Sequence, residues 1–231
     1  MAKVLRWPAR VETVVFDVDR TLYSGHYGDE YIKQGTMGEL EFLTGFLRTS
    51  SLEETRQILK EKRAKIGAEN GGGLSSISHA VFALGVTPEI WNVIRDGCYH
   101  PEDFLLPNPE LIELMEELPV RLAAATNSPR GVGRRVLETL GMGEMLKNGR
   151  MKVFGPEDCG CAKPDPRMYA VVASLMDVPP GTCVSFGDHE YKDCTMALEA
   201  GYGGAVVITD TADLMDFLRS ANFRTGRKEN E

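Results

Sequence analysis

The chain has 231 residues, of which 42% are hydrophobic and 26% are charged, and its 34 acidic and 26 basic residues give a formal net charge of −8. These are ordinary values for a soluble globular protein, and the length allows one domain with a substantial insertion. The acidic balance argues against broad binding to nucleic acid polymers.

Membrane and export signals are missing from the sequence. No apolar run approaches the roughly 18–20 residues of a membrane helix, and the N-terminus has no apolar signal-peptide core. We therefore expect a cytoplasmic protein with reduced thiols and no membrane partner. Cys159 and Cys161 have the spacing of half a metal site, but no second ligand pair at zinc spacing follows them, so we interpret both as structural.

The predicted strands alternate with predicted helices along most of the chain. The first strand, Val11–Asp19, is rich in β-branched residues and suits a central parallel strand that is covered on both faces. Four more strand-like runs follow, at Arg121–Thr126, Met151–Phe154, Cys183–Phe186 and Ala205–Thr209. This alternation predicts an α/β fold with a doubly wound parallel sheet.

Three helix start signals lie between the predicted strands or just before them. Asn108-Pro109, Ser128-Pro129 and Asp165-Pro166 each combine a capping residue with a proline at the first helical position. Further helices are expected over roughly Tyr191–Ala200 and Thr211–Ser220.

One long stretch interrupts the alternation. About 100 residues separate the first two strands, whereas a simple βαβ unit needs only about 30 residues in all. The excess contains an Asn70–Gly73 turn and helix-like runs at Leu40–Phe46, Leu52–Ile66, Ile77–Leu84 and Pro88–Gly97. We therefore expect a core formed by residues 1–26 and 106–231, and an inserted helical domain over residues 27–105.

Two aspartates close the first predicted strand. Asp17 and Asp19 alternate with Val18 and so start on the same face of the strand. Ligands of parallel sheets bind beyond the carboxyl ends of the strands, so both carboxylates are expected in that crevice. Burying two like charges together is costly unless a cation joins them or one is protonated.

Three further polar features stand at the carboxyl ends of later strands. Thr126-Asn127-Ser128 opens a helix with hydroxyl and N–H donors, which is a typical anion site. Lys163 immediately precedes the third helix of the core. Gly187-Asp188 closes another strand, with Asp193 five residues later.

The ligand types select a chemistry. Asp17, Asp19, Asp188 and Asp193 offer only oxygen atoms, which favours Mg²⁺ over Zn²⁺. A metal, Lys163 and hydroxyl donors together suit a phosphate monoester in transfer. One ionised aspartate can attack phosphorus, and the second can protonate the leaving alkoxide and then activate water.

These motifs resemble those of the haloacid dehalogenase superfamily. Asp17–Thr21 is similar to its first motif, Thr126 to its second, Lys163 to its third, and Gly187-Asp188 with Asp193 to its fourth. The spacing of the motifs resembles that of the subgroup with a helical cap inserted after the first strand. The residues within the motifs look most like those of the phosphatase branch that includes pyrimidine 5′-nucleotidase-like proteins. The resemblance implies a Rossmann-like core with an α-helical cap.

The resemblance also implies a role for each residue. Asp17 would be the nucleophile and a Mg²⁺ ligand, and Asp19 the general acid/base, with its backbone carbonyl on the metal. Thr126 would bind the phosphoryl group, with Asn127 beside it, and Lys163 would neutralise Asp17 and phosphate. Asp188 would ligate Mg²⁺ directly or through water, supported by Asp193, and Thr21 would be a structural or orienting residue. The partner would be a small phosphorylated substrate, and the protein a monomer or homodimer.

Several residues keep two interpretations. Arg20 and His189 depart from the family pattern, and are either neutral exposed changes or contacts to phosphate and to the metal's surroundings. The aromatic rings of Tyr23, Tyr27 and Tyr31 either pack at the entrance to the insertion or stack on a base or sugar. The basic residues of the insertion, interleaved with glutamates, predict a solvated helix face; they are Lys60, Lys62, Arg63 and Lys65.

The sequence thus predicts a Mg²⁺-dependent phosphatase of a sugar phosphate or nucleotide monophosphate. Three alternatives remain, namely a phosphomutase, a 2-haloacid dehalogenase and a non-catalytic binding protein. Asp19 disfavours the dehalogenase, which needs no acid for a leaving alkoxide. The presence of the full carboxylate set disfavours a non-catalytic protein.

Overall fold

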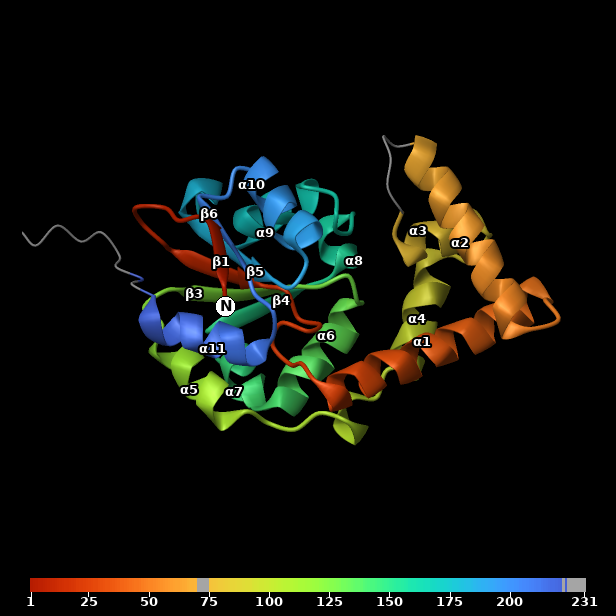
Figure 1. The fold of residues 1–231 in the computed structure, drawn as a ribbon, viewed down its shortest axis with the longest axis horizontal. Coiled ribbons are helices and arrows are strands. Elements are labelled where there is room, and N and C mark those ends of the chain that lie inside the picture. The colour runs from red at the N-terminus through yellow and green to blue at the C-terminus, as the bar shows by residue number, and fades with distance from the viewer. Residues whose placement is uncertain (70–74, 222, 224–231) are drawn as a thin grey trace, which may run out of the picture. The chain divides into compact units, whose positions relative to one another are not determined.

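The structure is a computed structural model that describes residues 1–69, 75–221 and 223. Its internal contacts divide the chain into two compact units, residues 1–29 with 101–231, and residues 30–100. Figure 1 shows the elements of both. The predicted Asn70–Gly73 turn lies outside the described residues.

The first unit is built on a six-stranded sheet with the order β1-β6-β5-β2-β3-β4. β2 (Thr13–Phe16) is completely buried and pairs in parallel with β3 (Arg121–Ala125) on one side and β5 (Cys183–Gly187) on the other. β4 (Met151–Phe154) and β6 (Gly204–Val207) extend the parallel sheet. The predicted α/β fold with a central first strand is confirmed.

The sheet also has an antiparallel edge that the sequence pattern did not predict. β1 (Lys3–Arg6) pairs antiparallel with β6. Its burial pattern is mostly exposed, so it lacks the apolar alternation that marks a strand in sequence.

Helices cover both faces of the sheet. α5 (Pro109–Glu117), α7 (Gly143–Lys147) and α11 (Thr211–Ser220) lie on one side, and α9 (Arg167–Leu175) and α10 (Met196–Glu199) on the other (Figure 1). α6 (Arg130–Leu137) and α8 (Pro156–Cys159) complete the connections. In the strand order, β3 and β4 lie on one side of β2, and β5 and β6 lie on the other. The point between β2 and β5, where the order of added strands changes side, is the usual ligand-binding position of this architecture.

Local chemistry explains where these helices begin. The side chain of Asn108 accepts a hydrogen bond from the Leu111 N–H at 3.1 Å, and Pro109 occupies the first helical position of α5, as predicted. Asp165 Oδ1 accepts from the Arg167 N–H at 2.9 Å just before α9. Each of these side chains bonds an N–H that has no partner within its helix. Pro129 and Pro166 precede the first helical residues of α6 and α9, so these two prolines lie one position earlier than predicted.

The second unit contains α2 (Leu52–Glu69), α3 (Ile77–Ala83), α4 (Pro88–Cys98) and most of α1 (His26–Leu47). Its core gathers Leu40 and Leu43 with Leu59, Val81 and Trp91. A buried ion pair joins α4 to α1, with Arg95 Nε 2.6 Å from Glu39 Oε1. None of the helices in the described part of the chain combines the length and apolar character needed to cross a bilayer.

Candidate functional site

The polar residues predicted from sequence stand at the carboxyl end of the parallel strands. Asp17 follows β2 directly, Thr126 follows β3, and Asp188 follows β5. Asp17 stays tied to the sheet because its backbone N–H donates to the Phe186 carbonyl at 2.8 Å. Lys163 lies between α8 and α9. Because ligands of a parallel sheet bind beyond the carboxyl ends of its strands, this strand-end rule explains why residues more than 100 positions apart meet here.

A buried lysine lies at the centre of this group. Lys163 is 2% exposed, and its Nζ donates to Asp17 Oδ1 and, at 2.8 Å, to Asp193 Oδ1. Asp17 and Asp193 are themselves 5% and 0% exposed. Lys163 therefore bridges two carboxylates that are both removed from water.

The electrostatics of this cluster keep the lysine charged. Burial alone disfavours the ammonium form, but the carboxylates of Asp17 and Asp193 outweigh it and hold the pKa of Lys163 well above its usual value. The pKa of Asp193 is raised by its burial and by the charge of Asp17, against the opposing effect of Lys163. One ammonium does not fully compensate the carboxylates, so the site favours a further cation.

Asp193 is fixed by its surroundings. Its Oδ2 accepts from the His189 N–H at 3.1 Å, and its carbonyl accepts from Ser185 Oγ at 2.7 Å. A Cβ on Gly187 would lie 2.3 Å from the Asp193 Cβ. Only glycine at position 187 therefore lets the turn after β5 approach Asp193 so closely.

Three carboxylates can share a cation. Ligand oxygens of Asp17, Asp188 and Asp193 all lie within 4.8 Å of one another. Asp188 Oδ1 is buried and has no hydrogen-bond partner among the described residues. A buried, unpartnered oxygen beside two other carboxylates, with oxygen as the only donor type, fits a hard divalent ion such as Mg²⁺.

Asp19 stands apart from the other three carboxylates. Within the described residues its side chain is not part of the three-carboxylate group. It is only partly buried, and its Oδ1 accepts from the Tyr23 hydroxyl at 2.6 Å. The strand ends at Phe16 rather than at Asp19, so the simple alternation of strand side chains does not extend through Asp19.

The hydroxyl of Thr21 donates a hydrogen bond to Asp17, as the hydroxyl of Tyr23 does to Asp19. Thr21 is completely buried, and its Oγ1 donates to Asp17 Oδ2 at 3.2 Å. Together with Lys163, it holds both oxygens of the Asp17 carboxylate. This geometry agrees with the orienting role that the resemblance implies for Thr21.

Hydrogen bonds fix the segment after β3 and tie it to the backbone of Lys163. Thr126 is 1% exposed, and its Oγ1 accepts from the Ser128 N–H at 3.0 Å. The Asn127 amide donates to the Lys163 carbonyl and accepts from the Lys163 N–H, both at 2.8 Å. We therefore propose that Asn127 positions Lys163, a contact that sequence spacing did not indicate. Phosphate binding by Thr126 and Asn127 stays a prediction.

The two departures from the family pattern are both exposed. Arg20 adopts the left-handed conformation (φ 63°) and pairs through its guanidinium with Asp29 Oδ1 at 3.1 Å. His189 accepts from the Lys192 N–H at 3.4 Å. Both side chains thus have partners on the protein itself.

The cysteines keep their structural interpretation. All five are free thiols. Burial raises the pKa of Cys159 to about 12, which keeps its thiol protonated and unreactive.

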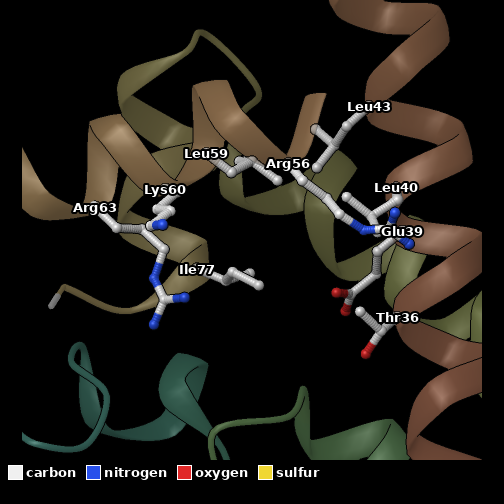
Figure 2. Close-up of a pocket in the computed structure, with 9 residues that line it drawn as sticks. All are labelled: Thr36, Glu39, Leu40, Leu43, Arg56, Leu59, Lys60, Arg63 and Ile77. Atoms are coloured by element: carbon white, nitrogen blue, oxygen red, sulfur yellow. The ribbon is translucent and has the colours of Figure 1, made fainter. Parts of the chain in front are cut away.

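The helical unit has a cavity of its own. It measures about 180 Å³ and lies among α1, α2 and Ile77 of α3 (Figure 2). Arg56, Lys60 and Arg63 line it from α2, and Leu40 and Leu43 from α1. Of the basic residues predicted as a solvated face, Lys60 and Lys65 are exposed, and Lys62 and Arg63 are half-buried. Lys60 and Arg63 also line this cavity, whereas Lys62 and Lys65 do not.

Comparison with known proteins identifies the family of this chain. A sequence model of haloacid dehalogenase-like hydrolases matches residues 11–201. The chain therefore belongs to the haloacid dehalogenase-like hydrolase family. A search of curated proteins finds no significant match.

Solved structures share the fold. The L-2-haloacid dehalogenase RSc1362 is 15% identical with a TM-score of 0.52, covering 92% of this chain and 100% of its own. A HAD phosphatase from Thermococcus onnurineus is 19% identical with a TM-score of 0.51, covering 84% and 85%. At these identities the likeness concerns the fold, and the reaction must be argued from the site.

Proposed function

We propose that this hydrolase is a Mg²⁺-dependent phosphatase that cleaves small phosphate monoesters through an aspartyl-phosphate on Asp17. The observation that carries the proposal is a pair of differently placed carboxylates. Asp17 is buried and held by Lys163 and Thr21, whereas Asp19 is partly exposed and held by Tyr23. Distinct environments of this kind suit one carboxylate to nucleophilic attack and the other to proton transfer.

The first chemical step forms the covalent intermediate. An oxygen of Asp17 attacks phosphorus, a bond forms between that oxygen and phosphorus, and the ester P–O bond breaks. Asp19 enters this step protonated and gives its proton to the leaving alkoxide oxygen. Lys163 places a fixed positive charge beside the attacking carboxylate, which lowers its repulsion by the phosphate oxygens.

The second step restores the enzyme. Asp19, now ionised, takes a proton from water as the water oxygen attacks phosphorus. The P–O bond to Asp17 breaks, inorganic phosphate leaves, and Asp17 returns to its carboxylate form. The net reaction converts a phosphate monoester and water into an alcohol and phosphate.

The metal is assigned to Asp17, Asp188 and Asp193, with the backbone carbonyl of Asp19 as a further ligand by family resemblance. When bound, Mg²⁺ supplies additional positive charge that stabilises the transferring phosphoryl group. Thr126 is assigned to the phosphoryl oxygens. The inserted helical unit is proposed as the cap that selects the substrate and excludes water.

The substrate class is tested by screening phosphorylated metabolites with Mg²⁺ and measuring free phosphate. We expect release from sugar phosphates or nucleotide monophosphates, including pyrimidine nucleotides. Isomerisation of a hexose phosphate without phosphate release would indicate a phosphomutase instead. Halide release from a 2-haloacid would indicate a dehalogenase.

Metal dependence gives a separate prediction. EDTA should abolish phosphate release, because the carboxylates around Lys163 exceed the charge that one ammonium compensates. Added Mg²⁺ should restore the rate, and the free-phosphate assay measures both effects. Activity that is indifferent to the chelator would remove the metal from the proposal.

A further inference from the structure

We infer that Tyr23 is a positioning residue that fixes which oxygen of Asp19 exchanges the proton. This inference rests on the proposed phosphatase function, and it assigns a role to a residue outside the four motifs. Tyr23 is 5% exposed, and its hydroxyl lies 2.6 Å from Asp19 Oδ1.

The backbone and the ring of Tyr23 are both held in place. The main chains of Asp19 and Tyr23 form a parallel bridge. The ring packs so closely on Gly28, in the first turn of α1, that a Cβ there would lie 2.7 Å from the Tyr23 Cδ2. The hydroxyl therefore approaches Asp19 from a fixed direction.

This fixed hydrogen bond distinguishes the two oxygens of Asp19. A tyrosine hydroxyl donates to a carboxylate, so Oδ1 is engaged as an acceptor. The proton that Asp19 gives to the leaving group is then carried on Oδ2, and the same oxygen takes the proton from water in the second step. The contact parallels that of Thr21 with Asp17, again four residues apart.

The test compares leaving groups in Tyr23→Phe, which removes only the hydroxyl. An alkyl phosphate found in the screen needs a proton on its leaving oxygen, whereas 4-nitrophenolate departs without one. We expect kcat/KM for the alkyl ester to fall about tenfold or more, and kcat/KM for 4-nitrophenyl phosphate to change less than about threefold. The value of kcat/KM is used because it reports the step that phosphorylates Asp17.

Two controls separate positioning from general damage. Tyr202→Phe also removes a buried phenol hydroxyl, which donates to the Tyr169 carbonyl at 3.0 Å, and should leave the ratio between the two esters unchanged. Gly28→Ala should displace the Tyr23 ring and shift the ratio in the direction of Tyr23→Phe. Equal losses with both esters in Tyr23→Phe would overturn the role of Tyr23. Absence of phosphate release by the wild type would instead overturn the proposed function.

A different observation, the cavity of the helical unit, leads us to propose a binding site for a compact organic anion. Arg56, Lys60 and Arg63 recur at i, i+4 and i+7 and thus share one face of α2. In Figure 2 the Arg56 side chain extends from α2 toward α1. The opposite wall includes the apolar side chains of Leu40 and Leu43.

The charges in this cavity do not cancel. Glu39, its one acidic lining residue, is already bonded to Arg95 at 2.6 Å. Arg56 has Glu53 at 3.5 Å, an exposed pair, and no carboxylate of the described residues lies within ion-pair distance of Lys60 or Arg63. Arg63 Nε donates to the Ser75 carbonyl at 2.7 Å, which holds its guanidinium without cancelling the charge. Lys60 and Arg63, two cations without a carboxylate partner, lie across from an apolar wall and match a ligand with one anionic group and a small apolar body.

Benzoate is a probe with this chemistry, and its uncharged counterpart is benzyl alcohol. We expect benzoate to shift the backbone amide resonances of Leu59, Lys60 and Arg63 saturably in the full-length protein, and benzyl alcohol to leave them unchanged. Lys60→Gln should weaken binding about fivefold or more, while Lys65→Gln, the same change on the same helix but outside the cavity, should weaken it less than about twofold. Non-saturating shifts, or equal effects of the two variants, would overturn this site.

Discussion

Replacing Asp17 with asparagine is expected to lower kcat for phosphate release by at least about 10³-fold while the protein stays folded. Asparagine keeps the shape of the side chain and an oxygen that can accept from Thr21 or Lys163, but its amide is a poor nucleophile. The loss should therefore appear in activity and not in the fold. Steady-state phosphate release, near-UV circular dichroism and thermal unfolding measure the two separately.

Asp165→Asn is the matched control for this change. Asp165 lies two residues after Lys163 and pairs with the exposed Arg167. The substitution removes an equal charge from the same region without touching Asp17, so activity should stay within about threefold of the wild type. Substantial phosphate release by Asp17→Asn would exclude the aspartyl-phosphate mechanism.

The central strands β2 and β5 were predictable because every residue in them is buried. β2 reads as a β-branched apolar run because neighbouring parallel strands cover its edges and helices cover its faces. β1 was missed because its side chains are mostly exposed, and only its pairing with β6, about 200 residues away, makes it a strand. Local pattern cannot report such a long-range pairing.

The site was predictable to the extent that strand ends define it. Asp17 and Asp188 follow β2 and β5 directly and gather as that rule requires, and Lys163 and Asp193 join them from the segments before α9 and after β5. The partners of Asp19 and Asn127 were not predictable, because both depend on how the chain turns after its strand. Once β2 ends at Phe16, the direction of Asp19 is set by its bond to Tyr23 and not by strand alternation.

Lys163→Met should be the most destabilising substitution in the site. It leaves Asp17 and Asp193 buried without the ammonium that bridges them, and removing one partner of a buried ion pair typically costs about 3–5 kcal/mol of unfolding free energy. The same change removes a fixed positive charge from the transferring phosphoryl group, so activity should fall by about 10²-fold or more. Denaturant unfolding in EDTA measures the first effect, and phosphate release measures the second.

The metal should partly offset this loss of stability. Without Lys163 the carboxylates of Asp17, Asp188 and Asp193 repel one another more strongly, so Mg²⁺ should raise the melting temperature of Lys163→Met by more than that of the wild type. Lys192→Met is the matched control, because Lys192 Nζ lies 3.9 Å from Asp193 Oδ2 and is about a third exposed. Solvent screens that pair, so its loss should cost less than about 1 kcal/mol. If the two variants unfold at the same denaturant concentration, Lys163 is not the charge that holds the carboxylates together.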